Sequence, residues 1–130
     1  MMGSAALLCV ASGLPAAAAI ALHDGNIRTA VEAWLSDSAA AEATCGHISA
    51  WETGGVTDMA YLFCAYPCTG QSWCSDCDTA AASFNEDISA WDVSGVTTMY
   101  YMFYKASAFN RDIGGWRVDN VRSMSAMFAG

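Results

Sequence analysis

The sequence is poor in basic residues and in charge altogether. Only 14% of its 130 residues are charged, and five lysines and arginines stand against thirteen aspartates and glutamates, which gives a net charge of −8. A nucleic-acid-binding surface needs clustered basic side chains that displace counterions from phosphates, and an anionic membrane surface attracts basic segments for the same reason. The sequence has no such cluster, so a nucleic-acid partner is close to excluded.

The sequence also lacks the patterns of common enzyme sites. It has two histidines, His23 and His47, and neither belongs to a Ser/His/Asp or Cys/His signature. It contains no G-x-G-x-x-G or G-x-x-x-x-G-K phosphate loop. Asp87 and Asp112 recur at one position of a repeat, where carboxylates more often cap turns than form an acid/base pair. We therefore expect a protein that is not an enzyme.

The N-terminal segment is apolar. Residues 5–22 carry no charged side chain, and Ala17-Ala18-Ala19 offers an A-x-A cleavage site. The first four residues lack the lysine or arginine of a signal peptide, and a glycine and a proline within the stretch disfavour a spanning helix. We interpret residues 1–21 as a leader and favour a signal peptide. An N-terminal membrane anchor and an incomplete start are the alternatives, and no other membrane span is expected.

Part of the sequence repeats at a spacing of 25 residues. FNEDISAWDV at residues 84–93 recurs as FNRDIGGWRV at residues 109–118, and the match continues to residue 128. A looser copy at residues 48–63 lies 40 residues before the second, which is 15 more than the period. We call these the first (48–63), second (84–108) and third (109–128) repeats. A period of 25 residues is within the range of leucine-rich repeats.

Each repeat combines two hydrophobic periods. Around Trp91 and Val93 the alternation has period two, which predicts a short strand with one buried face. From Met99 to Ala106 apolar residues follow the i, i+3, i+4, i+7 spacing of a helix face.

Two columns of the repeat lie between the predicted strand and helix. Gly55, Gly95 and Asn120 share one column and predict a tight turn with positive φ. The column that precedes the helix contains only good N-cap residues, namely Asp58, Thr98 and Ser123.

The predicted fold class is α/β: a short leucine-rich-repeat-like solenoid, with strand, turn and short helix in each coil and an N-terminal helical cap. Residues 22–45 form the cap, because Asp24 is placed to cap a helix that carries Ile27, Trp34 and Leu35 on one face. Residues 46–130 form about three coils, which must stack to bury their apolar side, with a cysteine-rich insertion at 64–83. The predicted core residues are Ile88, Trp91, Val93, Val96, Met99, Met102, Phe103, Ile113, Trp116, Val118, Val121, Met124, Met127 and Phe128.

The second and third repeats resemble the tandem F-N-x-D-I-x-x-W-x-V-x-x-V-x-x-M-x-x-M-F units of the BspA-like leucine-rich-repeat surface proteins. The resemblance covers roughly residues 48–128 and is weaker in the first repeat, where Thr53 replaces the second strand valine. It implies a repeat domain of cell-surface or secreted proteins, often in long arrays, with protein binding or adhesion as the usual suggestion.

Four cysteines lie close together in the insertion. Cys64, Cys68, Cys74 and Cys77 have the spacing C-x3-C-x5-C-x2-C. Disulfides are favoured if the chain is exported. A zinc site is the alternative, because four thiolates bind zinc tetrahedrally and the last pair has zinc-knuckle spacing. A variable loop with incidental cysteines is the third interpretation. We expect no cofactor, with zinc as the alternative.

The candidate binding residues are those that alternation directs outward from the strands: Glu52, Asp92, Ser94, Arg117 and Asp119. Tyr100, Tyr101 and Tyr104 form a second candidate surface, because tyrosine is enriched in interface cores. The function that we predict is a non-catalytic protein-interaction or adhesion module, secreted or on the cell surface. A structural spacer, an intracellular scaffold and a zinc-organised module are the alternatives. The partner is a protein or surface ligand, with self-association through the C-terminal coil as a further expectation.

Overall fold

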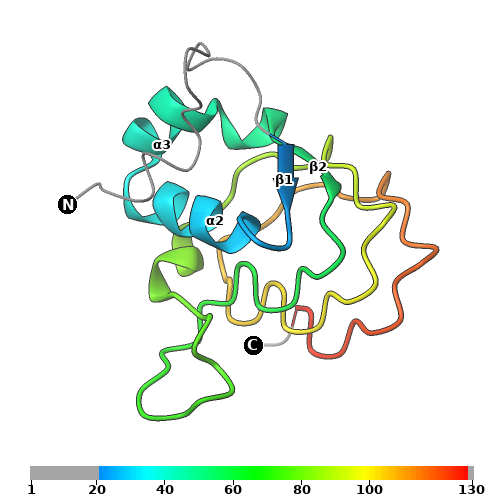
Figure 1. Ribbon diagram of the computed structural model, residues 1–130. Coiled ribbons are helices and arrows are strands. Elements are labelled where there is room, and N and C mark those ends of the chain that lie inside the picture. The colour runs from blue at the N-terminus through cyan, green and yellow to red at the C-terminus, as the bar shows by residue number, and fades with distance from the viewer. Residues whose placement is uncertain (1–20, 129–130) are drawn as a thin grey trace.

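The computed structural model describes residues 21–128, so the leader prediction lies outside the described residues except at Ala21 (Figure 1). In chain order the elements are β1 (Ala21–His23), α2 (Ile27–Ser36), α3 (Ser38–Cys45), a 3-10 helix (Ile48–Ala50), β2 (Glu52–Gly55) and a second 3-10 helix (Thr79–Ser83). The helices lie together at one end, and the repeat segments run side by side away from them.

Both α-helices lie within residues 22–45, where the sequence predicts helices. α2 buries Ile27, Val31 and Trp34 on one face, as the i, i+3, i+4 spacing requires. α3 begins after Asp37, whose side chain accepts a hydrogen bond from the Ala40 amide at 3.2 Å. It ends at Gly46, which has a φ of 80° and is a residue suited to helix ends for that reason. The buried faces of both helices join the main hydrophobic core.

Strands β1 and β2 form a parallel two-stranded sheet, in which Ala21 pairs with Glu52 and His23 with Gly55. Leu22 of β1 points into the core. A Cβ atom at Gly55 would lie 2.9 Å from the Leu22 carbonyl oxygen, so close approach of the strands requires this glycine. The sequence does not predict β1, because three residues are too few to show a period.

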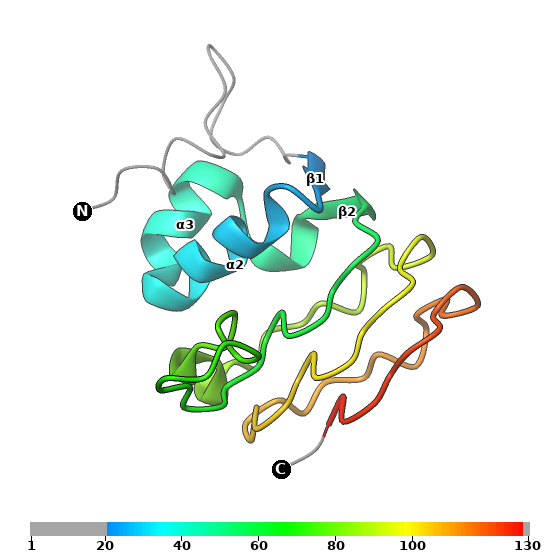
Figure 2. The same cartoon turned by 60° about the horizontal axis from the view of Figure 1, so that its bottom comes forward.

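The predicted solenoid of strand–turn–helix coils is wrong. The described part of the chain is a small domain of two α-helices and one two-stranded sheet, with two short 3-10 helices. Residues 56–128 contain no α-helix and no strand beyond isolated bridges that join Asp58 to Thr98 and Thr98 to Ser123. Those three residues therefore cap no helix. The second and third repeats are extended chain and turns (Figure 2).

Consecutive turns replace the predicted helices. The amides of Met102, Tyr104 and Ala106 each donate to the carbonyl three residues earlier, at 3.0 to 3.2 Å. Turns of this kind place apolar residues three and four positions apart, as a helix does, so hydrophobic spacing does not distinguish the two.

Alternate amides of these segments donate to a neighbouring repeat. The N···O distances are 2.7 to 3.1 Å, whereas a helix would use these amides internally. The donors to the second repeat are Met59, Tyr61 and Phe63 of the first repeat and Ala65 at the start of the insertion. The donors from the second repeat to the third are Met99, Tyr101 and Phe103.

Positive φ angles occur at a different column from the predicted one. Tyr61, Tyr101 and Ala126 occupy equivalent positions in the three repeats and have φ values of 64°, 60° and 54°. The predicted positive φ at Gly55, Gly95 and Asn120 is wrong, because none of these residues is in the left-handed region. The Asn120 side chain instead donates to the Ser94 carbonyl at 2.7 Å and links the third repeat to the second.

Tryptophans of successive repeats connect neighbouring segments inside the core. The indole N–H of Trp91 donates to the Ile48 carbonyl at 2.8 Å, and that of Trp116 donates to the Ile88 carbonyl at 3.1 Å. Trp51 and Trp91 also stack, with ring centroids 6.3 Å apart. A buried tryptophan needs a partner for its N–H, and for Trp91 and Trp116 the preceding repeat supplies that partner.

Most of the core predicted from the sequence is inside. Ile113, Val118 and Val121 are partly buried and pack against the core, and the fully buried members are Ile88, Trp91, Val93, Val96, Met99, Met102, Phe103, Trp116 and Met127. Met124 and Phe128 are exceptions, 43% and 61% exposed. The corresponding Met99 and Phe103 are covered because their amides hold the third repeat against them, and no described segment covers the third repeat in the same way.

Asp24 and Arg28 join the N-terminal end to the first repeat. The Asp24 carboxylate accepts bonds from the Thr57 amide and hydroxyl at 2.8 and 2.6 Å and from the Asp58 amide at 3.1 Å. Burial opposes ionisation of Asp24, but these bonds outweigh it and lower the pKa of the carboxyl. Asp24 therefore does not cap α2, whose N-cap residue Asn26 makes no side-chain cap bond.

Arg28 strengthens the same junction from α2. Its guanidinium donates to the Asp58 carboxylate and carbonyl, each at 3.2 Å, and to the Ala60 carbonyl at 2.8 Å.

Replacing Trp91 tests the tryptophan column. We expect Trp91→Ala to lower the free energy of unfolding by about 3–5 kcal/mol, the usual loss for a buried large aromatic side chain. Trp91→Phe keeps most of the packing but loses the bond to Ile48, so we expect a loss of about 1–2 kcal/mol. Urea unfolding measures both, and Trp73→Ala, at a more exposed ring, is the control. A loss below about 1 kcal/mol for Trp91→Ala would contradict the assigned burial.

The Asp24 junction predicts a pH dependence. Because the folded-state pKa is lowered, Asp24 stabilises the fold above its unfolded value of about 3.9 and loses this effect as the pH falls through the folded value. We expect Asp24→Asn to cost about 1 kcal/mol at pH 7 and the difference from the parent to shrink below pH 4. Urea unfolding across this range measures it, with Glu42→Gln on the exposed side of α3 as control. A difference that is constant with pH would contradict the assignment.

Candidate functional site

Four of the five candidate binding residues lie around one depression. Asp92 and Ser94 from the second repeat and Arg117 and Asp119 from the third line a hollow of about 410 Å³, which Asn120 completes. Glu52 is exposed on β2 but is not part of the lining. We call the five predicted residues the polar strip. The structure thus brings together residues that are up to 27 positions apart in the sequence.

The charged side chains of the polar strip differ in how strongly hydrogen bonds and ion pairs restrain them. The Asp92 carboxylate accepts bonds from the Ser94 hydroxyl at 2.6 Å and amide at 3.0 Å. These bonds lower the pKa of Asp92, with a smaller contribution from the positive charge of Arg117. Arg117 lies 3.7 Å from Asp119, but their side chains are 78% and 81% exposed, so this ion pair contributes little. Asp92 is therefore fixed, while Arg117 is available to a partner.

The recurring polar residues ahead of each tryptophan stabilise turns. Asp87 accepts from the Ser89 amide and hydroxyl, which lowers the pKa of its carboxyl, and Asp112 accepts from the Gly114 amide at 2.9 Å. In the first repeat the same position is His47, whose ring nitrogen lies 3.2 Å from the Ser49 amide that donates to it. At all three sites the side chain accepts a hydrogen bond from the backbone amide two residues later, which closes a short turn.

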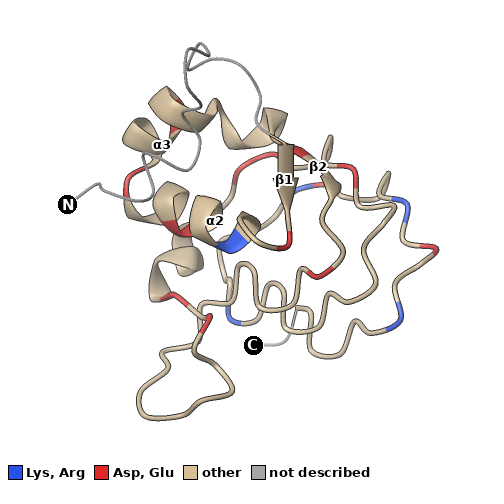
Figure 3. Cartoon of the chain, viewed as in Figure 1, with Lys and Arg blue, Asp and Glu red and all other residues tan. Residues whose placement is uncertain are grey.

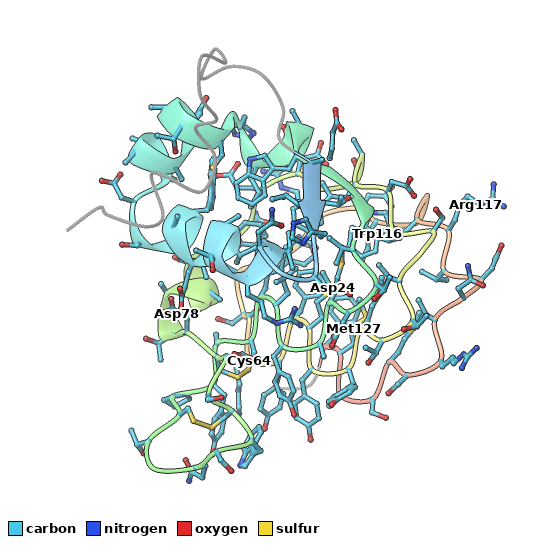
Figure 4. All side chains as sticks on the ribbon, viewed as in Figure 1. Asp24, Cys64, Asp78, Trp116, Arg117 and Met127 are labelled. Atoms are coloured by element: carbon cyan, nitrogen blue, oxygen red, sulfur yellow. A yellow bond between two sulfur atoms is a disulfide. The ribbon has the colours of Figure 1, made fainter. Side chains whose placement is uncertain are left out.

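The insertion is cross-linked by two disulfides. Cys64 pairs with Cys77 and Cys68 pairs with Cys74. A sulfur in a disulfide is not a thiolate ligand, so zinc binding at this site would require both bonds to be reduced. Within residues 21–128, no three His, Cys, Asp or Glu side chains are grouped to hold a metal ion. Figure 4 shows the cross-linked loop at the lower edge, well apart from Arg117.

Aromatic side chains of the insertion and of the first and second repeats form a second surface, on which Trp73 is exposed and the tyrosines are partly buried. We call it the aromatic cluster; its members are Tyr61, Tyr66, Trp73, Tyr100, Tyr101 and Tyr104. Tyr61 and Tyr101 stack at 5.2 Å, Tyr66 and Tyr104 at 5.6 Å, and the ring of Trp73 is 5.0 Å from that of Tyr66.

Sequence reasoning identifies only half of the aromatic cluster. It finds Tyr100, Tyr101 and Tyr104, which lie close together in the chain. Tyr61 occupies the same repeat position as Tyr101. Aligning the repeats is therefore enough to identify it as a candidate. Tyr66 and Trp73 belong to the insertion, whose path over the repeats has no periodic signature.

The charge distribution agrees with the composition. Acidic positions are spread over the helical end, the base of the insertion and the repeats, and basic positions are few (Figure 3). No helix among the described residues is both long enough and apolar enough to cross a membrane.

Removing the insertion disulfides distinguishes them from a metal site. The Cys64–Cys77 bond closes a loop with a sequence separation of 13, and such a loop restricts the unfolded chain by about 3 kcal/mol. We expect Cys64→Ala/Cys77→Ala to lower the free energy of unfolding by about 2–3 kcal/mol, and Cys68→Ala/Cys74→Ala, which opens a shorter loop, to lower it less. Urea unfolding of the oxidised protein should not change with EDTA. A chelator-dependent midpoint would show that the cysteines hold a metal.

Comparison with known proteins identifies one family. Neither the curated proteins nor the solved structures contain a match to the chain. The model of a family described as "Mycoplasma protein of unknown function, DUF285" matches residues 34–130. This range covers more than half of the chain and includes all three repeats, and the chain therefore belongs to the DUF285 family.

Proposed function

We propose that the protein is a non-catalytic interaction module of a surface or secreted repeat protein, and that the polar strip contacts the partner. The observation that carries the proposal is the shared hollow of the second and third repeats, lined by Asp92, Ser94, Arg117 and Asp119. These side chains are exposed, whereas Trp91 and Val93, which alternate with them, are buried.

A fixed backbone supports recognition by such a surface. Amides of the second repeat bond to the third, and the Asn120 side chain bonds to the Ser94 carbonyl next to the hollow. A surface that is ordered before binding loses less conformational entropy when a partner docks. Adjacent charges of both signs, at Asp92 and Arg117, favour a partner with a complementary pair and give specificity more than affinity.

Two findings support a location outside the cell. Disulfides persist in oxidising compartments and are rare in the cytosol, and the insertion has two of them. Membership of a repeat family and the resemblance to BspA-like surface proteins point in the same direction. The absence of a recognised catalytic signature in the sequence supports binding without catalysis.

Affinity capture with matched variants tests the proposal. The immobilised protein is incubated with the culture medium and solubilised surface proteins of its own source, alongside Arg117→Ala/Asp119→Ala and the control Glu42→Gln on α3. We expect the parent and the control to retain the same partner and the strip variant to lose at least about 90% of it, since charged interface contacts commonly account for this much affinity.

The same experiment separates binding from a purely structural role. A spacer that recognises nothing through the polar strip would give equal retention by all three proteins. That result would contradict the proposed function, provided that urea unfolding shows the strip variant to be as stable as the parent.

A further inference from the structure

The aromatic cluster leaves a large apolar ring exposed at a constrained position. Of the five tryptophans, four are buried and Trp73 is 44% exposed. Trp73 lies between Cys68 and Cys74, which are joined by one disulfide, and the other disulfide anchors the loop to buried Cys64. Exposed aromatic surface that is held in place in this way is typical of binding sites.

The backbone beneath the aromatic cluster is strained. Tyr61 and Tyr101 have φ values of 64° and 60°, in a region that bulky residues rarely occupy. Ala126 occupies the same position in the third repeat, so the turn does not require an aromatic residue. Strain of this kind is retained where the surroundings enforce it, and here it recurs in all three repeats. The two tyrosines are therefore candidates for a function beyond forming the turn.

Three carboxylates border the aromatic cluster. Glu32 of α2, Asp76 and Asp78 line one depression together with Tyr61 and a second depression of about 340 Å³ together with Tyr66. We call these three residues the acidic flank. Figure 4 places Asp78 beside Cys64 at the base of the insertion. Burial, together with Tyr100, Tyr101 and Asp76, raises the pKa of Tyr61, so this ring stays uncharged at neutral pH.

The chain already places its own cations at both parts of this surface. The Lys105 ammonium lies 5.8 Å from the centroid of the Tyr104 ring, within the distance at which a cation is attracted to an aromatic face. The Arg28 guanidinium approaches Asp76 to 3.8 Å while it holds Asp58 at 3.2 Å. Aromatic faces and carboxylates both attract cations, and the carboxylates repel an anionic ligand.

We propose that the aromatic cluster and the acidic flank bind an arginine- or lysine-bearing segment of a partner protein. Charge complementarity selects this occupant, because the chain has a net charge of −8 and three carboxylates line depressions together with the partly exposed rings of Tyr61 and Tyr66. The surface combines side chains of α2, the first and second repeats and the insertion, so it accommodates an extended segment with several cations. It is separate from the polar strip, since no residue lines both depressions and the hollow of the strip, and Figure 4 shows Arg117 well apart from Cys64.

Titration with a designed peptide tests this inference on the full oxidised chain. The probe is a peptide of alternating arginine and glycine. The control peptide contains citrulline in place of arginine, which keeps the shape of the side chain and removes its charge. Binding is followed by tryptophan fluorescence in the parent and by calorimetry in the variants. We expect the arginine peptide to shift the emission of exposed Trp73, and its affinity to fall as salt is added. The citrulline peptide should bind at least about tenfold more weakly.

Two variants test the aromatic cluster and the acidic flank separately. We expect Trp73→Ala and, separately, Glu32→Gln/Asp78→Asn to weaken the arginine peptide at least about fivefold. These positions are outside the buried core, and near-ultraviolet circular dichroism checks that each variant folds. Arg117→Ala/Asp119→Ala is the control and should bind the peptide as the parent does. The peptide result is thus independent of the capture experiment on the polar strip.

Three outcomes would overturn the inference. Equal affinity for the arginine and citrulline peptides would show that the positive charge is not recognised. Unchanged affinity of the Glu32→Gln/Asp78→Asn variant for the arginine peptide would show that the acidic flank does not contribute to binding. Sedimentation that shows self-association of the parent, lost in Trp73→Ala, would assign the aromatic cluster to a second copy of this chain instead.

Discussion

Hydrogen bonds from the backbone of one repeat to the next are the interaction on which the rest of the structure depends. In the segments that begin at Met59 and Met99, every second amide donates to the neighbouring repeat, and most of the amides between them close turns, namely those of Leu62, Cys64, Met102 and Tyr104. Buried amides must find partners, and this division satisfies both sets at once. It also explains why no helix forms there, since a helix would need all of these amides for bonds within one segment.

The buried tryptophans and the exposed surfaces both follow from this arrangement. Neighbouring segments held in register bring Trp91 beneath the Ile48 carbonyl and Trp116 beneath the Ile88 carbonyl. The same register places Asp92 and Arg117 around one hollow, and Tyr61 against Tyr101 on another face. The candidate binding residues are therefore adjacent because the core beneath them repeats.

The two candidate surfaces suit different ligands. The polar strip carries opposite charges that are close together and largely exposed, which favours specificity over strength. The aromatic cluster combines tyrosines of the first and second repeats with Tyr66 and Trp73, which lie on a loop held by two disulfides. With the function proposed above, the two surfaces would contact two partners or two parts of one partner.

The sequence by itself determined which residues are apolar and how they are spaced, and this was enough for the repeat period, the helices of residues 27–45 and most of the core. It also determined the outward direction of Asp92 and Arg117, because alternation around Trp91 and Trp116 leaves no other face for them. Hydrophobic spacing could not distinguish a helix from consecutive turns, because both place Met99, Met102 and Phe103 on one side. Only the tertiary structure decided this, since the choice depends on whether an amide finds its partner within its own segment or in a neighbouring repeat. The same holds for the disulfide pairing and for the contact of Trp73 with the tyrosines, which depend on the path of the insertion through space.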